Sequence, residues 1–203
     1  KILTSSATKI FAIDRVLYTT SLRQDGFYLK TVFPTPYTGL QEWTMSYAIK
    51  LDRNKANQAV LSPDFYSRVT ADGGLQMKVG ETDDPKAFAK TKLQPKKWYY
   101  IAWVYDHQHV KCYINGVLDN EFNVPKVETF TKLNMSWGAF EGYVREIRLY
   151  NKALTAFQVL DNLYIETPDN PNLLFYAPLN KKTGIKDVSK NNHPIKVYVP
   201  GSG

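Results

Sequence analysis

Two pairs of acidic residues lie close enough along the chain to suggest glycoside hydrolysis, which uses two carboxyl groups facing one sugar bond. Glu141 and Glu146 are an odd number of positions apart, so on one strand their side chains would point to opposite faces. Asp119 and Glu121 share a face, but they follow a hairpin turn, where carboxylates are normally solvated. Neither pair fits a retaining hydrolase, and we therefore predict that the protein is not an enzyme.

The histidines and the single cysteine suggest no catalytic or metal site of their own. His107 and His109 are two positions apart, as metal ligands on a strand can be, but they fall in a polar loop with only Asp106 nearby. His193 is isolated in the sequence. Cys112 lies in an alternating apolar segment and is interpreted as a small buried residue.

A run of lysines is the clearest candidate for binding an anion. Five lysines occur within twelve residues, with no acid among the five: Lys86, Lys90, Lys92, Lys96 and Lys97. Lys86, Lys90 and Lys92 are the candidate anion patch, and the alternative is a solvated loop that protects a sheet edge. Phe88 is the only aromatic residue between them, whereas single-stranded nucleic acids need several stacking platforms. We predict no nucleic-acid partner.

Sugar binding would need exposed aromatic rings beside polar groups, because a pyranose ring stacks through its C–H face while its hydroxyl groups accept and donate hydrogen bonds. Tyr66 with the neighbouring Arg68, Trp137 beside a glycine, and Tyr37 near a turn are the candidates. The alternative for each ring is packing in the core.

The elements that would carry these residues are mostly strands. In the segment 43–51, Trp43 and every second residue after it are large and apolar, which predicts a strand buried on one side. The segment 98–105 is almost wholly apolar, which indicates a central strand covered on both faces. Pro34 and Pro36 are expected to end the strand that begins near Phe27.

Further segments predict hairpins and a closing strand. Residues 71–74 (Ala-Asp-Gly-Gly) and the pair Asn115-Gly116 are turn sequences between short apolar runs. In the predicted strand 143–150, simple alternation places Arg145 on one face with Ile147 and Leu149. The same alternation places the following residues on the opposite face: Val144, Glu146, Arg148 and Tyr150.

One helix is predicted at 155–164, because Thr155 and Gln158 have the spacing of a capping box. The proline-rich stretch 167–172 is the best boundary candidate. We divide the chain into a domain at 1–166 and a linker with a two-strand C-terminal addition at 167–203, which is expected to dock on the domain because two strands do not fold alone.

The composition agrees with an all-β protein. The chain has 203 residues, 14% aromatic residues, one cysteine and a formal charge of +7. A single cysteine excludes a disulfide framework, and no apolar run is long enough to span a membrane. The fold class predicted is a jelly-roll sandwich of two antiparallel sheets with one short helix.

The residues 98–116 and 140–155 resemble the laminin-G-like, concanavalin A-type lectin and glucanase family. The hairpin 98–116, ending in Tyr113-Ile114-Asn115-Gly116, is similar to one signature of that family, and 140–155 (FEGYVREIRLYNKALT) is similar to its closing strand. The tail at 174–193 resembles the opening strand of the same family, at the opposite end of the chain. The tail therefore either begins a second module or completes this sandwich.

The resemblance implies a non-catalytic carbohydrate-binding module of a secreted or cell-surface protein, of the kind found in Bacteroidetes. The chain begins with Lys1, and a removed signal peptide is the expected route to the surface. Calcium is the ion that the family uses, which makes Asp72 and Asp106 candidate metal ligands. The alternatives are a structural or protein-adhesion module and, third, a glycoside hydrolase. The oligomeric state is left open.

Overall fold

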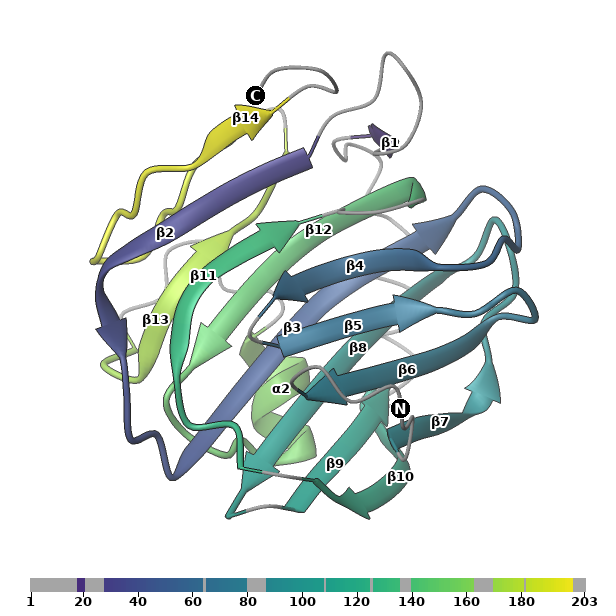
Figure 1. Cartoon of the computed structure of the whole chain (residues 1–203), viewed down its shortest axis with the longest axis horizontal. Coiled ribbons are helices and arrows are strands. Elements are labelled where there is room, and N and C mark those ends of the chain that lie inside the picture. Colours follow the sequence, from purple (N-terminus) through teal and green to yellow (C-terminus); the bar gives the residue numbers. More distant parts are fainter. Residues whose placement is uncertain are drawn as a thin grey trace.

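The structure is a computed structural model that describes residues 18–20, 28–63, 65–79, 87–107, 109–124, 126–135, 140–162, 170–180 and 182–198. Within these residues, two antiparallel sheets of seven strands each and one short helix confirm the predicted jelly-roll sandwich. Figure 1 shows the two sheets stacked face to face, with the helix behind the rear sheet. No helix in the described part is long and apolar enough to cross a membrane.

The rear sheet, called sheet A, has the strand order β1-β12-β3-β8-β9-β10, and β13 also pairs with β12. Its strands are β1 (Tyr18–Thr20), β3 (Glu42–Leu51), β8 (Trp98–Asp106), β9 (His109–Ile114), β10 (Val117–Asn123), β12 (Glu141–Tyr150) and β13 (Leu173–Ala177). The predicted turn at Asn115-Gly116 joins β9 to β10, and both residues have the positive φ that such a turn requires.

The front sheet, called sheet B, has the strand order β14-β2-β11-β4-β5-β6-β7. Its strands are β2 (Tyr28–Tyr37), β4 (Gln58–Pro63), β5 (Phe65–Val69), β6 (Gly74–Val79), β7 (Ala87–Lys92), β11 (Phe130–Met135) and β14 (Lys196–Tyr198). The C-terminal segment supplies one strand to each sheet, because β13 pairs with β12 and β14 pairs with β2. The division of the chain at residue 166 stays a prediction.

The core between the sheets is built around aromatic residues of β3 and β8. The rings of Trp43 and Tyr105 stack with their centroids 5.4 Å apart. Trp103 donates its indole N–H to the hydroxyl of Tyr47, which also hydrogen-bonds Ser67 of sheet B. These contacts join the two sheets, and burial raises the pKa of the Tyr47 hydroxyl above its ordinary value.

The prediction that β3 is buried on one side only is wrong. Thr44, Ser46 and Ala48 are fully buried on the second face. That face packs in a second apolar cluster with residues of β8, of α2 (Ala156–Asn162) and of β13. Short-range alternation could not show this cover, because α2 and β13 are more than 100 residues further along the chain.

The predicted alternation in β12 is also wrong, because the strand contains a bulge. Arg145 pairs with Ala48 and Arg148 with Ser46, so three steps along β12 match two along β3. Glu146 is the extra residue and has a φ of 57°. The bulge directs Val144, like Ile147 and Leu149, into the core between the sheets. It leaves both arginines on the covered outer face.

The prolines expected to end β2 lie inside it. β14 pairs with only the first three residues of β2, and the register with β11 shifts beyond Val32. Pro34 and Pro36 therefore lie in a part of β2 without regular strand pairing, where the N–H group that proline lacks is not required for a ladder hydrogen bond.

The predicted capping box at the start of α2 is confirmed. Gln158 N–H donates to the Thr155 hydroxyl oxygen at 3.2 Å, and Thr155 N–H donates to the Gln158 side-chain oxygen at 2.9 Å. We expect Thr155→Ala to lower the free energy of unfolding by about 1 kcal/mol, since one helix donor loses its partner. Urea unfolding measures this. The exposed Thr35 of β2 gives the control Thr35→Ala, and equal losses in both variants would contradict the capping role.

Candidate ligand-binding face

Three of the predicted site residues lie wholly or partly outside the described residues. Trp137 and Lys86 fall outside them, and Tyr66 lies in β5 with only its backbone described. Arg68 follows in the same strand, and its Nε donates to the side-chain oxygen of Gln76 at 2.6 Å. This hydrogen bond to Gln76 of β6 helps to position Arg68 in sheet B.

Tyr37 lies at the end of β2 and anchors the C-terminal segment. Its hydroxyl is 3.0 Å from Nε2 of His193, and its ring packs edge-on against Phe33 at 5.1 Å. Burial, and then the negative charge of Asp187, raise the pKa of the Tyr37 hydroxyl. This ring is half-buried, and its polar group is already engaged.

The two candidate calcium ligands lie in separate parts of the fold, Asp72 in the turn before β6 and Asp106 at the end of β8. The Asp72 carboxylate accepts hydrogen bonds from the Thr70 hydroxyl and Gly74 N–H and pairs with Lys92 at 3.0 Å. The hydrogen bonds from Thr70 and Lys92 lower the pKa of Asp72 to about 2. Hydrogen-bond donors and a lysine ammonium group surround the Asp72 carboxylate, and such surroundings do not fit a calcium site.

Asp106 is exposed at the end of β8. No group of three or more His, Cys, Asp or Glu residues suited to a metal occurs in the part of the chain that the structure describes. Calcium dependence therefore stays a prediction.

The two described lysines of the predicted anion patch lie at one edge of sheet B. Lys90 and Lys92 are exposed in β7, the edge strand. The backbone N–H of Lys90 donates to the Asp119 carboxylate, which ties β7 to β10. Since Lys92 pairs with Asp72, Lys90 is the more available cation of the two.

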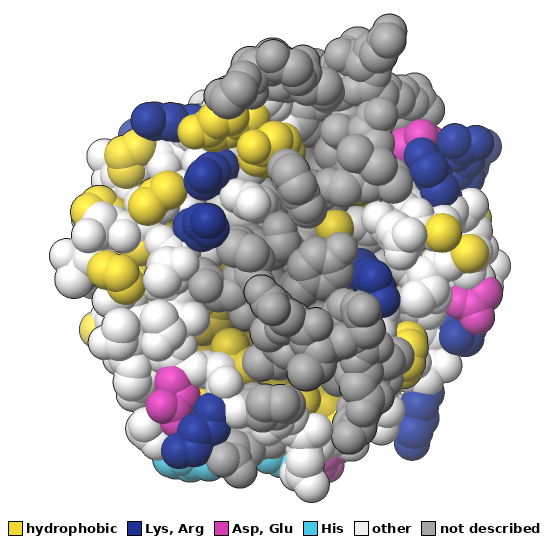
Figure 2. Space-filling model, viewed as in Figure 1, with side chains coloured by type: hydrophobic (Ala, Val, Ile, Leu, Met, Phe, Trp, Pro, Cys, Tyr) yellow, Lys and Arg dark blue, Asp and Glu magenta, His cyan; other side chains and the backbone are white. Residues whose placement is uncertain are grey.

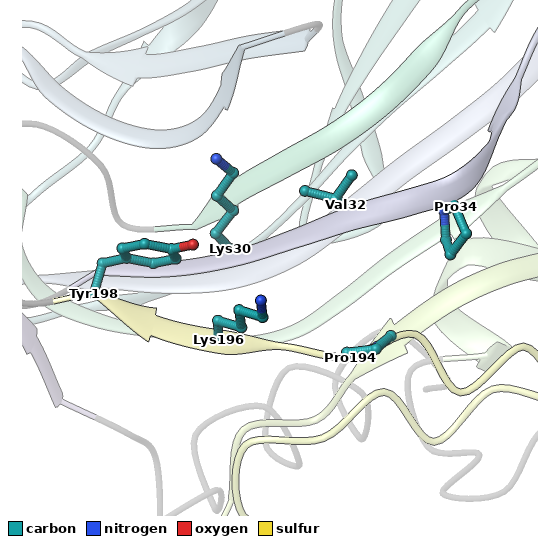
Figure 3. A pocket seen from close by; sticks show the side chains of 6 residues that line it. All are labelled: Lys30, Val32, Pro34, Pro194, Lys196 and Tyr198. Carbon is teal, nitrogen blue, oxygen red and sulfur yellow. The ribbon is translucent and has the colours of Figure 1, made fainter. Parts of the chain in front are cut away.

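A second group of cationic residues lies at the opposite edge of sheet B, and no sequence pattern indicated it. Here β2 and β14 form a groove of about 250 Å³ (Figure 3). Tyr198 lies at one end of the groove and two prolines at the other, with two lysines between them. The lining residues are Lys30, Val32, Pro34, Pro194, Lys196 and Tyr198.

The strand register explains how distant residues form this groove. Lys196 is directly opposite Lys30, and Tyr198 is directly opposite Tyr28. The two tyrosine rings stack with centroids 5.2 Å apart and planes 12° apart, and this contact restricts the position of the Tyr198 ring. The Lys30 ammonium group is 5.7 Å from the Tyr198 ring centroid. More than 150 residues separate the two strands in sequence, so no local pattern could have indicated the site.

Charge is divided unequally between the two sheets. The strands of sheet B contain seven basic residues and no acidic one: Lys30, Arg68, Lys78, Lys90, Lys92, Lys132 and Lys196. The strands of sheet A contain four basic and six acidic residues. In Figure 2, lysine or arginine and hydrophobic side chains gather over the β14–β2 edge at the upper left, with no acidic side chain among those described there.

The two glutamates of β12 are both engaged by cations. Glu141 contacts Arg53 at 3.0 Å and Lys55 at 3.1 Å. Glu146 is buried on the outer face of sheet A, where it contacts Arg145 and Arg148. The carboxylates of Glu141 and Glu146 therefore belong to two separate ion-pair networks.

Comparison with known proteins identifies the family. Residues 25–160 match the family described as the concanavalin A-like lectin/glucanases superfamily. The chain belongs to this superfamily. No curated protein sequence matches the chain.

Solved structures of this superfamily's fold resemble the chain at low sequence identity. A Bacteroides ovatus protein, provisionally described as carbohydrate binding, is 18% identical with a TM-score of 0.69 over 93% of this chain. This chain spans only 61% of the length of that protein. A heptameric SAP-like pentraxin from Limulus polyphemus is 12% identical, with a TM-score of 0.60 over 92% of this chain and 95% of its own.

A third structure is that of botulinum neurotoxin type C, whose cell entry depends on ganglioside molecules. It is 10% identical, with a TM-score of 0.51 over 75% of this chain and 46% of its own. At these identities the structures share the fold, and a fold alone does not determine a binding site.

Proposed function

We propose that the protein is a non-catalytic carbohydrate-binding module of a secreted or cell-surface protein, with its sugar site in the β2–β14 groove. The observation that carries the proposal is the Tyr198 ring, which lines the groove beside two ammonium groups. An aromatic face suits the C–H side of a pyranose ring, and the flanking ammonium groups suit its oxygen atoms. The lectin-like superfamily and the Bacteroides ovatus structure support the same class of ligand.

The non-catalytic part of the proposal rests on where the carboxylates lie. A retaining glycosidase places two carboxyl groups about 5 Å apart across the scissile bond. No acidic residue occurs in the described strands of sheet B, which include the two strands of the groove. Glu141 and Glu146 are held by arginine and lysine side chains on sheet A.

Replacing the ring of Tyr198 tests the site. We expect Tyr198→Ala to weaken binding to glycans that the wild type recognises on an array by about tenfold, because the stacking surface is lost. Tyr198→Phe keeps the ring and is expected to retain most of the affinity. Phe157→Ala removes an exposed ring from α2, on the far side of sheet A, and is expected to change nothing.

The outcomes separate the alternatives. Equal binding by wild type and Tyr198→Ala would place the sugar site elsewhere. Failure of the wild type to bind any glycan would favour a structural or protein-adhesion module. Repeating the array with EDTA in place of calcium tests whether the predicted ion contributes.

A further inference from the structure

We infer that the groove binds an acidic glycan, one that carries carboxylate or sulfate groups; this inference rests on the proposed function. Among the described residues, six line the groove; two of them are lysines and none is acidic. Lys132 of β11 is directly opposite Val32, so a third ammonium group lies one strand away on the same sheet. The four neighbouring strands β14, β2, β11 and β4 contain no acidic residue.

The arrangement of the two lysines gives a second, independent reason. Lys30 and Lys196 are direct cross-strand partners. Like charges at directly opposite positions destabilise a sheet. Neither lysine forms an ion pair with a carboxylate in the described part of the chain. An anion between the two ammonium groups would remove the repulsion, so the pair is arranged to gain from binding one.

The geometry of the strands relates the charges to the stacking ring. Residues two positions apart on one strand face the same side and are about 7 Å apart. Lys196 and Tyr198 have this relation on β14, and Lys30 reaches toward the Tyr198 ring from β2 (Figure 3). A sugar stacked on Tyr198 would therefore present its charged substituent to both lysines. A lysine ammonium group binds a carboxylate or a sulfate as a point charge, so the proposed ligand class is defined by its negative charge.

Matched pairs of polysaccharides test the inference. The probes are polygalacturonate against its methyl-esterified form, and dextran sulfate against dextran, together with an array that carries acidic and neutral glycans. The proteins are wild type, Lys30→Gln, Lys196→Gln, the double variant, Tyr198→Ala and Lys90→Gln. Lys90 is an exposed lysine of the predicted anion patch at the opposite edge of the same sheet, so Lys90→Gln separates binding at that patch from binding in the groove.

We expect wild type to bind a charged probe at least tenfold more tightly than its neutral counterpart. The double lysine variant should lose about tenfold or more of that affinity, and Lys90→Gln should lose little. Binding should weaken between 50 and 300 mM salt, as expected for ion pairs. Without ligand, the lysine variants should unfold at the wild-type temperature or above. Added charged probe should raise the unfolding temperature of wild type and Lys90→Gln, and should raise that of the double variant much less.

Other results would overturn the inference in distinguishable ways. If neutral probes or neutral array glycans bind as tightly as acidic ones, and Tyr198→Ala abolishes this binding, the sugar site stands and the acidic specificity fails. If polyanions bind all variants equally, or Lys90→Gln alone weakens binding, the groove is not the anion site. Tighter binding of single-stranded DNA, lost in the same variants, would indicate a nucleic-acid partner. Failure to bind any glycan contradicts the proposed function itself.

Discussion

Glu146→Ala is expected to lower the free energy of unfolding by about 3 to 5 kcal/mol, the range for breaking a buried ion pair from one side. Glu146 is 4% exposed, and its carboxylate contacts Arg145 at 2.8 Å and Arg148 at 3.1 Å. The Tyr176 hydroxyl also donates to it at 2.6 Å. Arg148 is completely buried, so removal of the carboxylate leaves its charge without this partner and away from water.

Urea unfolding followed by tryptophan fluorescence measures this loss. Glu121→Ala is the matched control, because Glu121 pairs with His109 at 2.7 Å but both side chains are partly exposed. Its loss should be under about 1 kcal/mol. The double variant Glu146→Leu with Arg148→Met should recover much of the stability, because apolar residues of similar size often replace a buried pair without cost. Equal losses in Glu146→Ala and Glu121→Ala would contradict the role assigned to the buried network.

Asp187→Asn is expected to lower the free energy of unfolding by about 2 to 3 kcal/mol at neutral pH, as expected for buried hydrogen bonds to a charged group. The Asp187 carboxylate is fully buried and accepts backbone N–H groups from Tyr176, Ser189 and His193. Nδ1 of His193 is also 2.8 Å from it. An asparagine side chain replaces one carboxylate oxygen by an NH₂ group, which cannot accept, so two of these donors would lose their acceptor.

This effect should depend on pH. Burial alone would raise the pKa of the Asp187 carboxyl, but the hydrogen bonds from His193, Tyr176 and Ser189 outweigh burial and hold the pKa below its ordinary value of 3.8. The carboxylate's contribution is therefore complete above about pH 4 and is lost as the pH falls through the lowered value. The stability difference between wild type and Asp187→Asn should therefore narrow as the pH falls below about 4.

Denaturant unfolding at several pH values measures that difference. Asp106→Asn serves as the control, because Asp106 is exposed at the end of β8, and its change should stay within about 0.5 kcal/mol at every pH. A difference for Asp187→Asn that does not narrow below pH 4 would contradict the assigned hydrogen-bonding role. The same contacts attach the C-terminal segment to sheet B. His193 contacts Asp187 through Nδ1 and the hydroxyl of Tyr37 in β2 through Nε2.

Local sequence patterns predicted the elements that depend on near neighbours. The apolar run 98–105 is a central strand buried on both faces, and the turn Asn115-Gly116 joins two strands as expected. The Thr155–Gln158 capping box starts α2. Each of these features depends on residues a few positions apart, whose types fix the backbone conformation by local sterics and hydrogen bonding.

The errors occurred where distant contacts override local alternation. The second face of β3 is covered by α2 and β13, and the bulge at Glu146 is held by the buried arginines of its own strand and by Tyr176 of β13. The sequence did not indicate the structural role of His193 for the same reason. Its ring links Asp187 to Tyr37, which is 156 residues away in sequence and is brought near only by folding.

The superfamily, the all-β class, the hairpins and the formal charge of +7 follow from the sequence alone. The place of that charge on the surface depends on the tertiary structure. Pairing of β14 with β2 brings Lys196 opposite Lys30 and Tyr198 beside Tyr28, and the register of seven strands collects basic residues on sheet B. The physical reason is that strand pairing acts between segments far apart in the chain, whereas sequence patterns report only on neighbours.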